Sequence, residues 1–261
     1  MKREAIARIF WIALIVAVAV FLTLPLLLVI LFSFNASALT SFPLTGFTLD
    51  WYVRLFAYES FWPALRASIV IGTVVSILSV VTGTLAALGL ARMRERYASF
   101  LIAALSAPMM LPALIIGVAL LSYFVRFLDV PLGLHTVVLG HLVIIQPFVV
   151  AIIYSRLATF DWALVENARD LGASPLRAFL TITLPIVQPT IVGAALIALS
   201  ISLDDFVITF FTIGSGNTLP TLVWGFVRTS LDPSINAIAS LLILLSIGST
   251  ILALSISKYR G

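Results

Sequence analysis

Residues 160–189 read FDWALVENARDLGASPLRAFLTITLPIVQP, the most charged stretch of a chain that is otherwise strongly apolar. Asp161 is expected to cap a short helix that runs through Leu171. Gly172 then stands where a left-handed residue ends a helix. Ser174-Pro175 has the pattern of an N-cap followed by proline at the first helical position. The stretch therefore predicts two short helices that meet at a sharp glycine turn, with Leu184-Pro185 opening the next long helix.

Apolar residues in this stretch have helical spacing. Leu164, Ala168 and Leu171 fall at i, i+4 and i+7, which predicts one apolar stripe on the first short helix. A stiff, protruding pair of helices can fit a socket on another protein. It can equally be an ordinary loop lying on a membrane surface, and local physics leaves both interpretations open.

The composition outside this stretch is that of a membrane protein. Of the 261 residues, 62% are apolar and 10% are charged. A soluble domain has about 45–50% apolar residues and about 25% charged residues. Because about 20 apolar residues cross a bilayer core as a helix, the long uncharged runs predict six spans. They cover roughly residues 9–34, 64–91, 98–125, 134–157, 184–212 and 234–257. The expected fold class is an all-α integral membrane protein with six transmembrane helices.

The sequence predicts three regions. Residues 1–63 hold the first helix and an outer loop, residues 64–257 hold a core of five helices with the loop 161–185, and residues 258–261 form a tail. Six spans place both termini on the same side, and cytoplasmic loops carry the excess of Lys and Arg. Cytoplasmic termini put these basic residues inside: Lys2, Arg3, Arg8, Arg92, Arg94, Arg96, Arg156, Arg169, Arg177, Lys258 and Arg260. Only Arg54, Arg66, Arg126 and Arg228 are then outside, so both termini are expected in the cytoplasm.

Several kinds of chemistry are excluded by residue counts. There is no cysteine, so disulfides and thiolate metal sites are impossible. Lys2 and Lys258 are the only lysines and neither follows a glycine-rich loop, so the chain has no Walker A sequence. We expect no catalytic residue, no metal site and no cofactor bound by this chain. The net charge of +4 indicates basic cytoplasmic loops rather than nucleic-acid binding.

The charged loop resembles a known motif. The pattern E-A-A-x3-G-x9-I-x-L-P marks the membrane subunits of type I ABC importers, and six positions match it: Glu166, Ala168, Gly172, Ile182, Leu184 and Pro185. Asn167 replaces the first alanine of the pattern. The resemblance implies that this loop is the coupling helix, which docks into a groove on a cytoplasmic ATPase subunit. The implied contact residues are Glu166, Ala168, Arg169, Asp170, Leu171, Gly172 and Ala173.

Residues 44–250 also resemble the second permease of spermidine/putrescine importers, in stretches such as GHLVIIQPFVVAIIYSRL and SLDDFVITFFTIG. The resemblance implies a multi-pass protein of the bacterial inner membrane that forms half of a translocation path. The implied partners are a dimer of ATP-binding subunits, a second and usually different permease, an extracytoplasmic solute-binding protein and membrane lipid. Similar permeases carry opines, amino-acid derivatives or other small organic solutes, so these remain alternative substrates. An ATP-independent channel or accessory subunit is the competing class of function.

An acidic pair interrupts the fifth predicted span. Asp204 and Asp205 lie in an otherwise uncharged run, at about 28 Å from Pro185 along a helix. An ionisable residue inside a span is costly and indicates function. Small or polar residues recur at helical spacing on one stripe: Ala195, Ala198, Ser202, Asp205, Thr209 and Thr212. Such a stripe can line a path for a cationic solute or pack against a neighbouring helix. The candidate path residues are Asp204, Asp205, Ser202, Thr209, Thr212 and His141 of the fourth span.

Overall fold

The computed structural model describes residues 2–38, 41–229 and 233–258. Within these ranges the regular structure is helical, apart from one isolated antiparallel bridge between Asn35 and Phe47. The chain divides into two compact units, Met1–Phe61 with Val223–Leu244, and Trp62–Leu222 with Leu245–Gly261. The second unit holds the coupling loop and the acidic pair.

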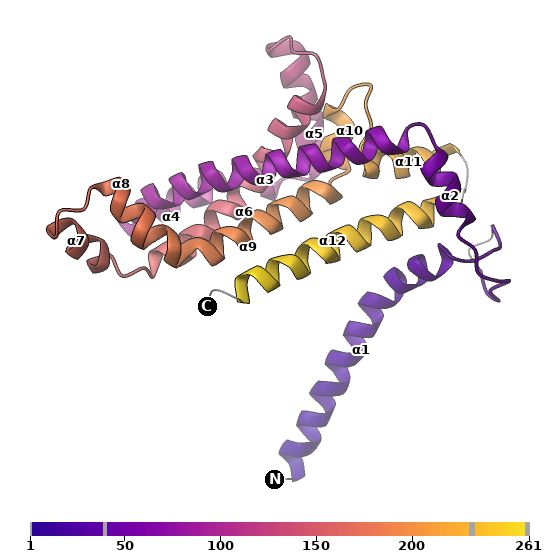
Figure 1. The fold of residues 1–261 in the computed structure, drawn as a ribbon, viewed down its shortest axis with the longest axis horizontal. Helices are drawn as coiled ribbons and strands as arrows, with labels where there is room; N and C mark the ends of the chain where they lie inside the picture. Colours follow the sequence, from indigo (N-terminus) through magenta and orange to yellow (C-terminus); the bar gives the residue numbers. More distant parts are fainter. Residues whose placement is uncertain (1, 39–40, 230–232, 259–261) are drawn as a thin grey trace. The chain divides into compact units, whose positions relative to one another are not determined.

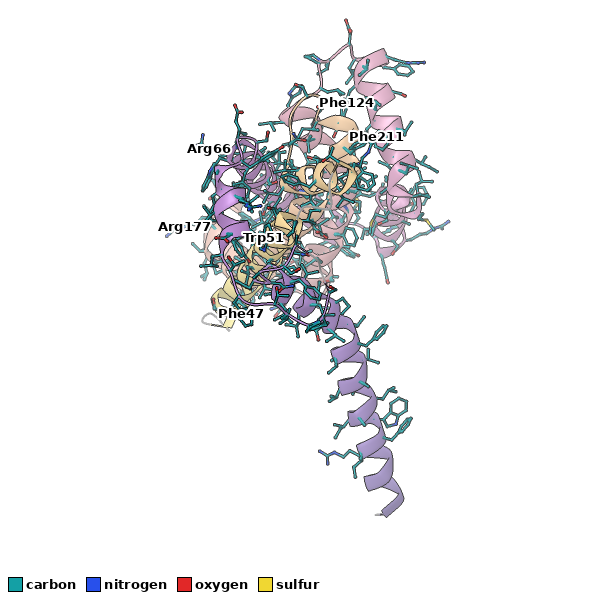
Figure 2. All side chains as sticks on the ribbon, turned by 90° about the vertical axis from the view of Figure 1, so that its right-hand side faces the viewer. Phe47, Trp51, Arg66, Phe124, Arg177 and Phe211 are labelled. Atoms are coloured by element: carbon teal, nitrogen blue, oxygen red, sulfur yellow. The ribbon has the colours of Figure 1, made fainter. Side chains whose placement is uncertain are left out.

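The first unit begins with α1 (Lys2–Phe32), whose apolar side chains project around the helix (Figure 2). The loop after α1 is tied to α2 (Asp50–Ala57) by hydrogen bonds. The indole Nε1 of Trp51 donates to the carbonyl of Asn35 at 2.7 Å, and the hydroxyls of Ser33 and Tyr52 are 2.7 Å apart. These bonds satisfy polar groups of Ser33 and Asn35, which are both buried.

Three long helices form the centre of the second unit and lie side by side in Figure 1. They are α3 (Phe61–Ala91), α6 (Leu134–Ala158) and α9 (Leu184–Asp204). Their fully buried contacts include Val75, Val149 and Val187. A Cβ atom added at Gly83 of α3 would lie 2.7 Å from the side chain of Val149. Gly83 therefore lets α3 and α6 pack closely, which is typical of membrane helices.

The third predicted span is not a single helix. The expected helix over 98–125 is instead divided into α4 (Glu95–Leu105), η1 (Ala107–Met110), α5 (Ala113–Ser122) and a π-helical turn, η2 (Tyr123–Phe127). Pro108 and Pro112 stand at the interruption. Proline removes a helical hydrogen bond and its ring clashes with the preceding turn, so two prolines four residues apart end the helix.

The fifth predicted span differs at both ends from the expected 184–212. The segments α8 (Pro175–Ala178), η3 (Phe179–Thr183) and α9 follow one another without a gap, so the span begins at Pro175. It ends at Asp204, and α10 (Val207–Thr212) is a separate short helix. The second short helix expected in the loop is therefore the first turn of the long helix.

In the described ranges, four helices are long and apolar enough to cross a membrane: Arg8–Phe32, Phe61–Ala91, Leu134–Ala158 and Pro175–Asp204. Two shorter apolar helices, Ala113–Phe127 and Ser234–Gly248, correspond to the remaining predicted spans. The second of these belongs to α12 (Ser234–Lys258), which follows α11 (Leu219–Thr229). The six-span count and the cytoplasmic termini remain predictions, and residues 259–261 of the predicted tail lie outside the described residues.

Candidate functional site

The coupling loop forms the predicted helix, glycine turn and helix start. It stands at one end of the second unit, where α7 (Ala163–Asp170) and α8 are labelled in Figure 1. Asp161 Oδ1 accepts the backbone N–H of Ala163 at 3.1 Å, and Ser174 Oγ accepts that of Arg177 at 3.3 Å. Gly172 has a φ of +90°, a conformation that disfavours residues with a Cβ atom. The glycine turn and the Ser174 cap are present as predicted, whereas Trp162 rather than Asp161 is the N-cap residue of α7 and the helix ends at Asp170.

The predicted apolar stripe is only partly packed against the protein, because Ala168 contacts the hydrophobic core while Leu164 and Leu171 are exposed. The buried residue is Val165, which is 7% exposed, whereas Leu164 is 43% and Leu171 is 90% exposed. An almost fully exposed leucine beside a sharp turn is an available apolar contact. Leu164 and Leu171 are therefore the members of the predicted stripe that are open to a partner.

Aromatic stacking holds the base of α7 against α3. The guanidinium of Arg92, just beyond the end of α3, lies 3.8 Å from the centre of the Trp162 ring. Trp162 also packs edge-on against Phe160, with ring centroids 4.9 Å apart. A cation over an indole face is attracted by the ring quadrupole. The sequence analysis did not identify Trp162, although the tryptophan directly after Asp161 is an aromatic residue within a charged loop.

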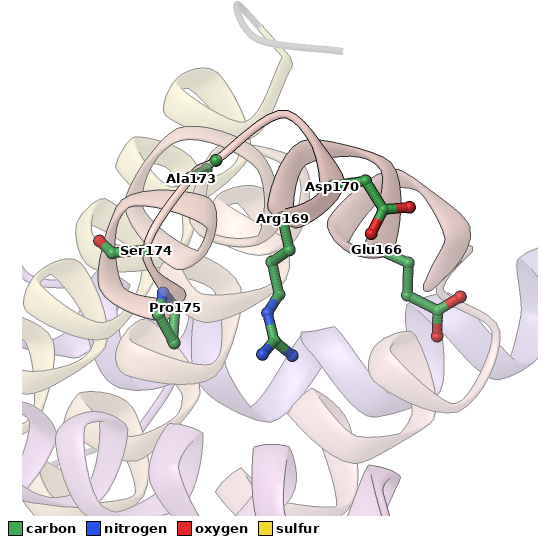
Figure 3. A pocket seen from close by; sticks show the side chains of 7 residues that line it. Glu166, Arg169, Asp170, Ala173, Ser174 and Pro175 are labelled. Atoms are coloured by element: carbon green, nitrogen blue, oxygen red, sulfur yellow. The ribbon is translucent and has the colours of Figure 1, made fainter.

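Seven residues of the loop line an open cavity of about 430 Å³, shown in Figure 3. They are Glu166, Arg169, Asp170, Gly172, Ala173, Ser174 and Pro175. In Figure 3 the side chain of Arg169 extends in a different direction from the carboxylates of Glu166 and Asp170. Five of the seven predicted coupling residues line this cavity, while Ala168 and Leu171 do not. The loop thus presents both signs of charge on one open surface.

A buried polar cluster joins α6 to the broken end of the fifth span. His141 is 1% exposed, and its Nδ1 atom lies 2.7 Å from Ser202 Oγ. Its Nε2 atom lies 2.9 Å from Thr209 Oγ1 and 3.2 Å from Asp205 Oδ2. Four predicted path residues are thereby brought into direct contact, and of these Asp205 also lines an open cavity.

Asp205 also stabilises the break itself. Its backbone is extended where α9 ends, and its Oδ2 atom accepts the backbone N–H of Thr209 at 3.0 Å. This bond satisfies a donor in the first turn of α10 that has no partner within the helix. The hydroxyl of Thr136 on α6 donates to the carbonyl of Thr212 at 2.7 Å. Thr212 is itself fully buried, so this bond holds the end of α10 against α6.

Asp204 lies in a different environment from Asp205. Its side chain is exposed and lines an open cavity of about 530 Å³ with Ser200, Ile201, Asp205, Phe206, Val207 and Ser246. Asp205, by contrast, contacts the imidazole of His141 through its Oδ2 atom. One carboxylate of the pair is therefore engaged within the protein, and the other faces a space that a ligand can enter.

Comparisons with known proteins agree with the motif. A family model described as "Binding-protein-dependent transport system inner membrane component" matches residues 79–259. The putrescine transport system permease protein PotI of Escherichia coli K12 is 36% identical over 230 residues, covering 85% of this chain and 82% of that protein. The spermidine/putrescine transport system permease protein PotC of Haemophilus influenzae is 33% identical over 239 residues, covering 91% and 92%.

Two solved structures have a similar fold. A chain of a bacterial ABC transporter involved in the import of the acidic polysaccharide alginate matches with a TM-score of 0.76 and 17% identity, over 99% of this chain and 96% of that one. A chain of the MetNI methionine ABC transporter matches with a TM-score of 0.62 and 18% identity, over 77% of this chain and 97% of that one. The all-helical fold expected from the sequence is therefore confirmed as one shared with chains of ABC transporters.

Proposed function

Since the chain belongs to the family of binding-protein-dependent transport system inner membrane components and is a permease of an ABC importer, we propose that it carries a polyamine or a related cationic amine. Two relatives that share about a third of its residues are named for putrescine or spermidine/putrescine transport. A polyamine carries several ammonium groups and requires anionic partners in an apolar path. The chain offers such a partner at Asp204.

The environment of Asp204 is the observation that carries this proposal. An exposed carboxylate lines an open cavity at the end of a long uncharged helix. A negative charge inside a membrane span is costly, and an incoming ammonium group would offset that cost by supplying the opposite charge. Asp205 already contacts His141 and Thr209. Its role would therefore be structural, to stabilise the wall of the cavity that Asp204 also lines.

The proposed assembly needs further subunits. One permease supplies half of a path and a single coupling loop, so a second permease, usually a different chain in this family, would complete the path. A solute-binding protein would deliver the amine from outside, and a dimer of cytoplasmic subunits would bind and hydrolyse ATP. This chain would contribute no catalytic residue and no cofactor. We place the assembly in the bacterial inner membrane, where the family description puts its members.

Coupling would pass through α7. Closure of the ATPase dimer would displace the surface formed by Glu166, Arg169 and Asp170, together with the exposed Leu171. Ser174 starts the helix that continues without a gap to Asp204. Movement of the loop would therefore be carried along one continuous helix to the acidic pair, because a helix transmits displacement along its axis.

The test is amine uptake by cells that lack the chromosomal copy of the chain and carry a plasmid copy. We expect Asp204→Asn to raise the apparent KM for spermidine at least tenfold, because it removes the carboxylate that meets the ammonium group. The control Asp50→Asn removes the same charge from an exposed residue of α2 and should leave uptake unchanged. Membrane abundance is measured by immunoblot. Equal uptake by both variants at equal abundance would contradict a substrate role for Asp204.

A further inference from the structure

A third cavity lies where α3, α7 and the start of the fifth span meet. It has a volume of about 490 Å³, adjoins the coupling cavity through the shared residues Arg169 and Pro175, and shares no lining residue with the cavity at Asp204. Its walls include the apolar side chains of Leu85, Leu88, Leu176 and Phe179. Leu85 and Leu176 are 65% and 66% exposed. The groove is therefore open and largely apolar.

Two arginines border the same groove. Arg92 and Arg169 both line it, and no acidic residue does. Neither arginine has a recorded ion pair in the described ranges of the chain. Arg92 stacks on Trp162 through the face of its guanidinium, and stacking leaves the N–H donors at the edge of the group available. The groove thus combines two positive charges with an apolar floor.

The sequence around the groove has the pattern expected at a membrane boundary. The last residues of α3, 85–91, are uncharged, and Arg92, Arg94 and Arg96 follow directly. A change from apolar helix to basic turn marks the level of the lipid headgroups. Basic pockets between helices at this level bind anionic headgroups.

We propose that this groove binds one anionic phospholipid. Its phosphodiester would accept hydrogen bonds from Arg92 and Arg169, since guanidinium groups bind phosphate through paired N–H donors. One acyl chain would lie along Leu85, Leu88 and Leu176, covering apolar surface that is otherwise open. The bound lipid would connect the end of α3 to α7 and so brace the coupling loop. This inference does not depend on the identity of the transported solute.

Gly89 allows a sharp test. A Cβ atom added at Gly89 would have nothing within 4 Å, and Gly89 lines the groove. Gly89→Leu therefore has room for its Cβ atom and is expected to place its side chain in the groove, and leucine favours the helix more than glycine does. Arg92→Gln removes one of the two charges. Arg94→Gln is the matched control, because it removes the same charge two residues further along, where the side chain does not line the groove.

The experiment uses the full chain, purified in detergent with the subunits that co-purify and stripped of lipid. Dioleoyl phosphatidylglycerol, dioleoyl phosphatidylcholine and glycerol 3-phosphate are titrated in, and bound lipid is counted by native mass spectrometry. We expect one tightly bound phosphatidylglycerol and at least tenfold weaker binding of phosphatidylcholine. Arg92→Gln should weaken phosphatidylglycerol binding about fivefold, because a basic residue at this level contributes about a factor of five.

Gly89→Leu should abolish the tight site, and Arg94→Gln should retain it. Equal binding of the two lipids, or tight binding that persists in Gly89→Leu, would overturn the proposal. If glycerol 3-phosphate displaces the lipid at an equal concentration, the apolar walls play no part, and the proposal of a lipid site is likewise overturned. Uptake is not the readout, so failure here is distinct from failure of the polyamine assignment.

Discussion

The Nε2 atom of His141 lies 3.2 Å from the Oδ2 atom of Asp205, joining the N-terminal third of α6 to the point where the fifth span breaks. The same imidazole reaches Ser202 before the break and Thr209 after it. One side chain therefore spans the discontinuity from the opposing helix. We therefore expect this contact to hold the two sides of the break together, while Asp204 lies outside it and lines the open cavity.

His141→Ala is expected to lower the thermal stability of the purified protein. Ser202 and Thr209 would lose a buried hydrogen-bond partner, and each unsatisfied buried group costs about 1–3 kcal/mol. The measurement is the temperature at which half of the protein remains monodisperse in detergent. His135→Ala is the control, because His135 is exposed. Identical midpoints for the two variants would contradict a structural role for the cluster.

Asp205→Ala is expected to be less stable than Asp205→Asn. The asparagine retains an oxygen that can accept the backbone N–H of Thr209, which is 3.0 Å from Oδ2 in the native protein. Loss of a capping acceptor costs about 0.5–2 kcal/mol. The same thermal assay compares the two variants. The capping interpretation fails if Asp205→Asn melts at or below the temperature of Asp205→Ala.

Glu166→Lys is expected to abolish uptake while the protein remains in the membrane at normal abundance. Glu166 is exposed on α7 and lines the open cavity of the loop, so reversing its charge changes the docking surface and leaves the core untouched. Glu95→Lys reverses an exposed charge in the first turn of α4 and is the control. Uptake by Glu166→Lys that equals the control would show that this surface does not couple to an ATPase.

Gly172→Ala is expected to reduce uptake because it strains the backbone of the turn, without any side-chain clash. An added Cβ atom meets nothing within 4 Å, but the φ of +90° is unfavourable for any residue with a Cβ, at a cost of about 1–2 kcal/mol. Relaxation of the turn would tilt α7 relative to α8. Gly193→Ala in α9 also meets nothing and has no positive φ, so it should retain uptake. Equal uptake by both variants would mean that the turn geometry is unimportant.

The geometry of the coupling loop could be predicted because it depends on the chemistry of neighbouring residues. Features that depend on packing between distant segments could not be predicted from the sequence. Gly172 and Ser174-Pro175 act through their own backbone, and the structure has the turn and the cap where they predict them. Leu184-Pro185 suggested a helix start, yet the helix runs through it. A π-helical turn over Phe179–Thr183 directly precedes this proline, and such a turn re-spaces the carbonyl groups that the ring would otherwise meet.

The helix break after Asp204 could not be predicted from the sequence, because the helical spacing of small and polar residues continues across it. The stripe from Ser202 to Thr212 retains helical periodicity, but the side chain of Asp205 takes the N–H of Thr209 and competes with the helix for that donor. The contacts of His141 depend on the register between α6 and α9, which no local pattern encodes. The roles of Asp204, Asp205, Ser202, Thr209, Thr212 and His141 in transport remain predictions.

The most direct test of polyamine import is the uptake of radiolabelled spermidine and putrescine by source cells with and without this chain. The account predicts that concentrative uptake is lost when the chain is absent, returns with a plasmid copy, and requires ATP. Unchanged uptake in its absence would contradict the polyamine assignment and direct the search to opines, amino-acid derivatives and other organic solutes. Uptake that depends on the chain but persists without ATP would contradict the ABC mechanism.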